Sequence, residues 1–366
     1  MSPCLPTEIA ERVIDFLCED QDALRQCALA SRALTARCQF YLFRRFNHAT
    51  FRDEKRLADL TCDAPHLAKL ITILYVDIFI TLDAFPILPN LRVVHMHGKP
   101  QYGLLQVPAS LFNKIRVSTP ALVDVRISYG HLDELDTLVQ LLHTRTSITS
   151  LALDTVAALG DPIERSLVAR PMNLNHLKIV GADDLTLSYL WTHFIGQLSS
   201  TRALSLRRLD IEITASTVFE ANYALSSMEA LQDLRIIVLY SPPREGALDL
   251  SHNNVLQSLA FSVELYGAGS RTAHDVSFIS ASCQTVASPD FDHLSLRMCI
   301  VVNSSMDEFK NLGTELQRPE FKRLKDLDIT ISTDRVPEFA QIFRPLVDKG
   351  IHVHVADVDG HFNLDL

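Results

Sequence analysis

The sequence predicts an α/β protein in two parts: a short N-terminal module of three helices, followed by a solenoid in which strands and helices alternate. Three observations support this prediction. One template of apolar residues returns ten times from residue 71 onward. Apolar stripes with a helical period lie between several of its copies. Residues 5–45 contain three short segments with helix-start signals, which places the domain boundary near residue 48 and predicts domains 1–48 and 49–366.

The first predicted helix begins at Pro6, because a proline at a helix start loses no hydrogen bond that the helix would otherwise make. Ile9, Val13, Phe16 and Leu17 then recur at helical spacing, and charged residues occupy the opposite side. The sequence therefore predicts a short amphipathic helix whose apolar face needs a covering surface.

Two more helices are predicted to follow the first. Asp20 and Asp22 are good capping residues for the second helix, which carries Leu24. Ser31 is in a position to cap the third, which runs towards Phe43. A module of about 45 residues is marginal as an independent core. We therefore expect the rest of the chain or a partner to cover part of its apolar surface.

The repeated template is an apolar residue followed by two more, three and five positions later. Its ten copies are Ile71/Leu74/Val76, Leu91/Val94/Met96, Leu122/Val125/Ile127, Ile148/Leu151/Leu153, Leu174/Leu177/Ile179, Thr201/Leu204/Leu206, Leu231/Leu234/Ile236, Leu256/Leu259/Phe261, Phe291/Leu294/Leu296 and Leu324/Leu327/Ile329. The copies lie about 28 residues apart, near the long end of the range for short solenoid repeats. Each copy predicts a strand whose alternate residues face the core, so residues such as Leu151, Leu177, Leu204, Leu234 and Leu259 should stack in one buried row.

Helices are predicted between the strands. One stripe follows Gly130 and comprises Leu132, Leu135, Leu138, Val139 and Leu142. A second comprises Leu187, Leu190, Trp191, Phe194 and Leu198. Pro162 and Pro337 mark further helix starts, and Gly350 ends the last helix. Strands alternating with helices predict a parallel strand ladder with outer helices. A doubly wound α/β sheet is the alternative, and ten copies of one template favour the solenoid.

The order of pieces in residues 5–45 resembles an F-box. The resemblance rests on Leu5-Pro6-Thr7-Glu8-Ile9, then Leu24 to Arg32, then Leu42-Phe43-Arg44-Arg45. The repeats that follow are similar to the degenerate leucine-rich repeats that commonly come after an F-box. This resemblance implies docking on a Skp-type adaptor, and through it on a cullin, largely by apolar burial. The matching positions are Leu5, Pro6, Ile9, Leu17, Leu24, Leu29, Leu42 and Phe43.

The resemblance implies a substrate-receptor subunit of a cullin–RING (SCF-type) ubiquitin ligase, which catalyses nothing itself and holds an unknown target protein on its repeats. Ser31 stands where the family usually has a cysteine. The family also usually has tryptophans near the positions of Leu34 and Phe43, whereas the single tryptophan of this chain, Trp191, lies outside the module. An alternative is therefore an interaction scaffold outside any ligase, in which a degenerate F-box serves only as a packing cap.

The residues between the core-facing strand positions are expected to form the target-binding face. Five of them are basic: Arg126, Lys178, Arg207, Arg235 and Arg297. Such a stripe suits an acidic or phosphorylated segment, because guanidinium groups bind carboxylate and phosphate through paired hydrogen bonds. Six aspartates share this face: Asp77, Asp124, Asp154, Asp233, Asp326 and Asp328. The near balance of charge favours a solvated surface as the alternative interpretation.

Bulk properties argue against several other classes of function. The net charge of −10 gives no reason to expect a nucleic-acid partner. No signal peptide or membrane span is predicted, and seven scattered cysteines indicate a reducing compartment, cytoplasmic or nuclear. No catalytic motif is found and no cofactor is expected. The pairs His95/His97 and His352/His354 lack a third ligand in the nearby sequence, so no metal site is predicted.

Overall fold

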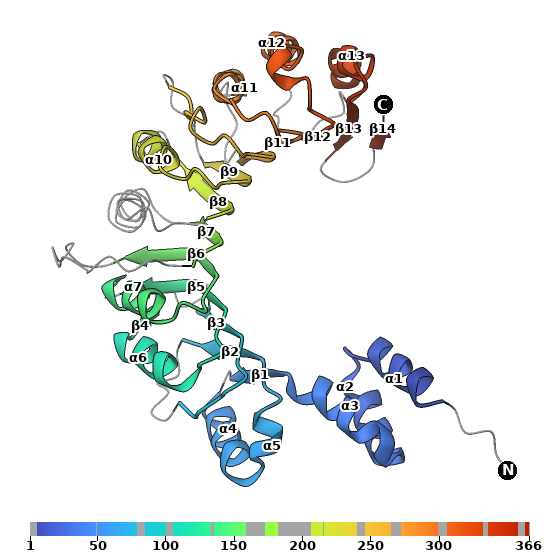
Figure 1. The fold of residues 1–366 in the computed structure, drawn as a ribbon, viewed down its shortest axis with the longest axis vertical. Helices are drawn as coiled ribbons and strands as arrows, with labels where there is room; N and C mark the ends of the chain where they lie inside the picture. Colours follow the sequence, from blue (N-terminus) through green and yellow to red (C-terminus); the bar gives the residue numbers. More distant parts are fainter. Residues whose placement is uncertain are drawn as a thin grey trace. The chain divides into compact units, whose positions relative to one another are not determined.

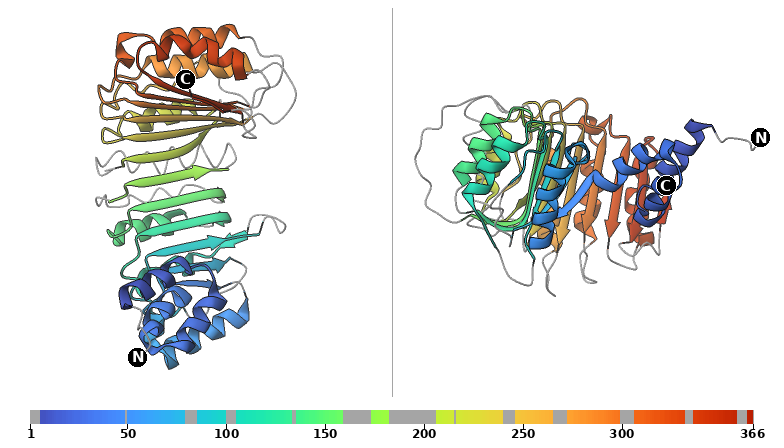
Figure 2. Two further views of the ribbon diagram at one scale, coloured as in Figure 1. Left: turned by 90° about the vertical axis from the view of Figure 1, so that its right-hand side faces the viewer. Right: turned by 90° about the horizontal axis from the view of Figure 1, so that it is seen from below.

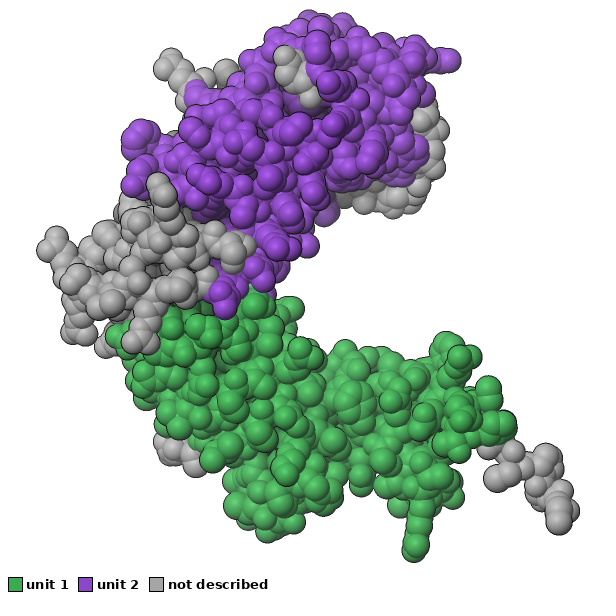
Figure 3. Space-filling model, viewed as in Figure 1, with its two compact units in different colours: residues 1–149, 158–160 green, residues 150–157, 161–366 purple. Residues whose placement is uncertain are grey.

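The computed structural model forms two compact units, residues 1–149 with 158–160 (unit 1) and residues 150–157 with 161–366 (unit 2) (Figure 3). The structure describes residues 6–48, 50–78, 85–99, 105–132, 135–158, 173–181, 206–214, 216–239, 246–264, 272–298, 306–331, 336–357 and 363–365. Both units combine parallel strands with helices, so the predicted α/β class is confirmed.

Unit 1 begins with three helices: α1 (Thr7–Phe16), α2 (Gln21–Ala30) and α3 (Arg32–Phe43). Pro6 directly precedes α1, as predicted. The carboxylate of Asp20 caps α2 by accepting hydrogen bonds from the backbone N–H groups of Asp22 and Ala23, at 3.1 and 2.9 Å. Ser31 occupies the N-cap position of α3, but its side chain makes no capping hydrogen bond.

A strand ladder follows the three helices in unit 1. Its strands are β1 (Arg45–His48), β2 (Ile73–Asp77), β3 (Val93–His97), β4 (Leu105–Val107) and β5 (Asp124–Leu132), and its helices are α4 (Phe51–Asp63), α5 (Pro65–Ala68), α6 (Ala109–Ser118) and α7 (Leu135–Thr144). Strands β1, β2, β3 and β5 pair in parallel in this order, and β4 pairs with the second half of β5. Helices α6 and α7 lie along one face of the ladder (Figure 1). The first strand, β1, lies within the range predicted for the helical module.

Unit 2 continues the same strand-and-helix alternation. Its strands are β6 (Ser150–Ala158), β7 (His176–Val180), β8 (Arg208–Ile213), β9 (Asp233–Leu239), β10 (Ser258–Glu264), β11 (His293–Met298), β12 (Asp326–Ile331), β13 (His352–Asp357) and β14 (Asn363–Asp365). Its described helices are α10 (Val218–Leu225), α11 (Thr272–Gln284), a 3₁₀ turn (Pro319–Phe321), α12 (Asp307–Glu315) and α13 (Val336–Val347). Strands β6 to β13 pair in parallel in chain order, and only β14 is antiparallel to its neighbour (Figure 2).

The core of each unit is built from rows of apolar side chains that stack from strand to strand. In unit 2 the residues of one such row are Leu151, Leu177, Leu209, Leu234, Leu259, Leu294, Leu327 and Val353. All of them have relative exposures of 2% or less. In unit 1, Phe46, Leu74, Val94 and Val125 occupy the equivalent row. The predicted solenoid-like strand ladder is therefore confirmed, because in each unit one position of the strand pattern forms a buried row.

One of the ten predicted copies has the wrong register. The row position predicted for Leu204 is held by Leu209, which pairs with Leu177 on one side and Leu234 on the other. The true copy is Leu206/Leu209/Ile211, and Leu204 lies outside the described residues. The error arose because two overlapping runs, one through Leu204 and one through Leu209, fit the same spacing. Only the pairing with neighbouring strands fixes the register, and the register decides which residues of a strand face the core.

The helix predictions agree with the structure for most of the residues that it describes, with one exception at Leu132. Helix α7 carries the buried residues Leu138 and Leu142 of the stripe after Gly130, whereas Leu132, predicted to be helical, is the last residue of β5. Helix α13 starts beside Pro337, and Gly350 follows it with a φ of 84°, a conformation that favours glycine. The stripe of residues 187–198 and the helix start at residue 162 lie outside the described residues.

Candidate functional site

The three N-terminal helices share a small core. Ile14, Leu24 and Cys38, one from each helix, form its fully buried centre. The residues that pack partly buried against this centre are Leu17, Cys27, Ala28, Leu34, Tyr41 and Leu42. Three helices joined by so few buried side chains leave other apolar residues unburied, as their length predicts.

A polar clamp joins α1 to α3 beside this core. The Asp15 carboxylate accepts hydrogen bonds from Nε and Nη2 of Arg37, at 2.8 and 2.9 Å, and from the Tyr41 hydroxyl at 2.9 Å. The hydrogen bond from Arg37 holds the pKa of Asp15 below its ordinary value. The clamp fixes how the two helices pack, and no sequence pattern predicted it because the partners are 22 and 26 residues apart.

Large apolar side chains are exposed on the outer surface of this module. Ile9, Val13 and Phe16 of α1 have relative exposures of 45%, 48% and 90%, and Leu29 of α2 has 84%. Ile9, Val13 and Phe16 follow one another at spacings of four and three residues, so they lie on one side of α1. Exposed apolar residues gathered in this way are typical of protein-interaction sites. We call the three side chains of α1 the apolar helix surface, whereas Leu29 is exposed separately on α2.

The structure places the residues expected to bind an adaptor in three different environments. Pro6, Ile9 and Leu29 are exposed, whereas Leu24 is completely buried in the core of the module. Leu17, Leu42 and Phe43 are half-buried, and Leu5 lies outside the described residues. Leu24 thus supports the helices from inside. The set of expected contacts did not include Phe16, which has the highest exposure among the large apolar side chains of the described residues, although its helical spacing from Ile9 was already visible in the sequence.

The open face of the unit 1 ladder carries a row of polar and aromatic side chains. Asn47, Tyr75, His95 and Arg126 occupy equivalent positions on β1, β2, β3 and β5. The rings of Tyr75 and His95 lie against each other with their centroids 4.7 Å apart and their planes tilted by 39°. Burial, and then the neighbouring Arg126, lowers the pKa of His95.

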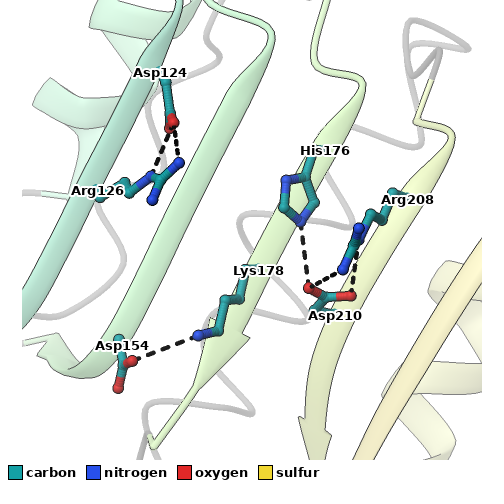
Figure 4. A network of polar contacts seen from close by, with 7 residues as sticks. All are labelled: Asp124, Arg126, Asp154, His176, Lys178, Arg208 and Asp210. Carbon is teal, nitrogen blue, oxygen red and sulfur yellow. Dashed lines mark hydrogen bonds and ion pairs between the residues drawn. The ribbon is translucent and has the colours of Figure 1, made fainter. Parts of the chain in front are cut away.

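Basic residues on this face of unit 1 are paired with acidic ones. Nη2 of Arg126 lies 2.7 Å from Oδ2 of Asp124, whose side chain is largely buried (Figure 4). Nζ of Lys99 lies 3.0 Å from Oδ2 of Asp77. Both pairs reduce the positive charge that the row presents to solvent.

The open face of unit 2 shows the same pairing. Asp210, which is 5% exposed, accepts from Nε and Nη2 of Arg208, both at 3.3 Å, and lies 3.4 Å from Nε2 of His176 (Figure 4). Burial alone would raise the pKa of Asp210, but the hydrogen bonds from His176 and Arg208 hold it below its ordinary value. Lys178 faces Asp154 of the neighbouring strand at 3.6 Å.

The five basic residues predicted to form one stripe do not share one row. Lys178 and Arg235 stand at equivalent positions, with Asp210 between them. Arg297 lies in a different row, opposite Ser262 of β10. Arg126 belongs to unit 1.

The prediction that placed Arg207 on a strand was wrong. Arg207 precedes β8, where its backbone N–H donates to the carbonyl of Asn175 and its own carbonyl accepts from Gln232. The shifted register of this repeat is the cause, and Asp210 occupies the row position instead. The predicted basic stripe is therefore interrupted by a buried acidic residue.

Neither a metal centre nor a membrane helix is recognisable in the part of the chain that the structure describes. Among those residues, no three His, Cys, Asp or Glu side chains gather closely enough to hold a metal ion. None of the described helices has the length and apolar character needed to span a bilayer. Comparison of the chain with protein-family models and with curated proteins finds no match in either case.

Proposed function

We propose that this protein is a substrate-receptor subunit of a cullin–RING ubiquitin ligase. In this proposal α1 to α3 act as an F-box that docks a Skp-type adaptor, and the open face of the strand ladder binds a target protein. The protein positions its target, and the transfer chemistry takes place on other subunits. The observation that carries the proposal is the apolar helix surface. It lies on the first helix of the segment whose sequence order resembles an F-box, where that resemblance implies adaptor docking.

The physical basis of docking would be burial of this surface. Burying a side chain such as Phe16 removes well over 100 Å² of apolar area from water, which is worth about 2–3 kcal/mol by area. Interfaces concentrate their binding energy in a few such anchors, and aromatic residues are frequent among them. Phe16 and Leu29 are the most exposed anchors on the module.

The test is binding of the full chain to a purified Skp-type adaptor, measured by biolayer interferometry. Phe16→Ala should weaken binding by about fivefold or more, the effect of losing a contact worth about 1 kcal/mol. Phe219→Ala is the matched control, because Phe219 is 83% exposed but lies on α10 in unit 2. Equal adaptor affinity of the two variants, or no binding by the unmodified protein, would exclude the proposal.

A second candidate is an interaction scaffold that never joins a ligase. One observation favours it: β1 begins two residues after α3 ends and pairs with β2, so the helical module is continuous with the first strand of the ladder and is suited to capping it. A solenoid needs such a cap to cover its terminal repeat. The same adaptor measurement separates the two candidates, because a cap alone has no affinity for the adaptor.

A further inference from the structure

A cavity in unit 1 gathers basic side chains from three elements that are separate in the sequence. It has a volume of about 390 Å³, within the range of small-molecule sites. Arg25 of α2, Arg45 of β1 and Arg56 of α4 contribute to its lining, together with Phe43 and Asn47. Figure 1 shows β1 and α4 at the start of the ladder, where α3 leads into β1. None of these three arginines was singled out as a binding residue by the sequence pattern.

The positive charge of this cavity is only weakly compensated. Arg25 pairs with Asp22 at 2.7 Å and Arg45 with Glu19 at 3.0 Å, but the side chains of these two acids are 90% and 69% exposed. Exposed ion pairs contribute little, because water screens both charges. An anion with stronger acceptor oxygens can therefore replace the carboxylates at little cost.

Arg56 is the most available of the three guanidinium groups. Its guanidinium carbon lies over the ring of Phe46, 5.9 Å from the ring centroid. Within the described residues it forms no ion pair. Asp53, the carboxylate in the cavity lining, accepts a hydrogen bond from the Thr50 hydroxyl at 2.7 Å as part of the N-terminal cap of α4.

We propose that this cavity is a binding site for a small organic phosphate. A phosphoryl group carries up to two negative charges and three acceptor oxygens, which suits three guanidinium groups lining one cavity better than a single carboxylate does. Phe43 and the ring of Phe46 supply an apolar wall, so the organic part of the ligand should be flat or apolar. The amide of Asn47 adds a further polar contact. The cavity shares Leu42 and Phe43 with the positions expected to bind the adaptor, but its three arginines are not among those positions.

The test is isothermal titration of the full chain with phenyl phosphate at low salt, with phenol and inorganic phosphate as the two halves of the ligand. Phenyl phosphate should bind more tightly than either half, and its affinity should fall as salt rises. Arg56→Gln should weaken binding about tenfold, the loss expected for one charge-assisted hydrogen-bonding partner. Lys55→Gln is the matched control, because Lys55 is exposed on the same helix but does not line the cavity.

Two further measurements complete the test. Arg25→Gln should also weaken binding, which keeps the proposal testable if the first variant folds poorly by circular dichroism. A short phosphotyrosine peptide that binds as well as phenyl phosphate would identify a protein side chain as the natural source of the group, whereas binding of phenyl phosphate alone would indicate a free small molecule. No binding of phenyl phosphate, or equal affinity for the Arg56→Gln and Lys55→Gln variants, would overturn the proposal. Adaptor binding should be unchanged in both variants, because α4 lies outside the three proposed docking helices.

Discussion

The N-terminal helices and the strand ladder of unit 2 differ in how far their apolar side chains are exposed to solvent. In the ladder, Leu177, Leu234 and their row neighbours are no more than 2% exposed. In the helices, Phe16 and Leu29 are 90% and 84% exposed. The ladder buries its apolar rows because each repeat covers the next, whereas three short helices have too little mutual surface. Apolar residues thus form a core in one region and remain exposed in the other.

The largest effect on stability is expected from a substitution in the buried row of the ladder. Leu209→Ala should lower the free energy of unfolding by about 2–5 kcal/mol, because it leaves a cavity among tightly packed neighbours. Denaturant unfolding followed by circular dichroism measures the change. Phe16→Ala should shift the midpoint by much less, since its side chain already faces solvent. Similar losses of unfolding free energy for the two variants would contradict the difference in burial between the two regions.

A smaller effect is expected where a polar residue occupies a core position. His48 is fully buried at the end of β1, in the row of Val76 and Met96. Among the residues that the structure describes, neither of its ring nitrogens has a hydrogen-bond partner. Its replacement by Leu should stabilise the protein by about 1 kcal/mol, because it removes an unsatisfied buried polar group.

The same site predicts a dependence of stability on pH. Burial lowers the pKa of His48 from 6.5, even though Asp53, Glu54 and Asp77 act in the opposite direction. The unfolded chain therefore binds the proton more readily, so this site costs no stability through protonation above pH 6.5, and the free energy of unfolding falls as the pH drops below that value. His48→Leu should remove this part of the acid dependence, measured as melting temperature against pH. The exposed His66 provides the control, and an unchanged pH profile for the His48 variant would contradict the prediction.

The smallest effect is expected on the polar face of unit 2. Lys178→Ala should change the free energy of unfolding by no more than about 0.5–1 kcal/mol, because its pair with Asp154 is partly exposed and screened by water. Chemical denaturation with and without added salt measures it. A loss as large as that of Leu209→Ala would show that the polar face contributes to stability as strongly as the core.

Most of the ladder was predictable because its signal is local and repeated. A strand that buries alternate residues needs apolar side chains at fixed spacing, and nine of the ten copies have the predicted register. The failure at Leu204 came from two overlapping runs of equal spacing, between which only pairing with β7 and β9 decides. The predicted position of Arg207 depended on that register, so the prediction of a continuous basic stripe was wrong for the same reason.

The sequence by itself determined the alternation of strand and helix, the apolar rows and the amphipathic character of α1, because each depends on residues a few positions apart. Only the tertiary structure decided which apolar residues stay exposed, as Phe16 does, and which become core, as Leu24 does. It alone brought Asp15 to Arg37 and gathered Arg25, Arg45 and Arg56 around one cavity. The physical reason is that burial and charge pairing depend on neighbours in space, and residues from separate elements become neighbours only when the chain folds.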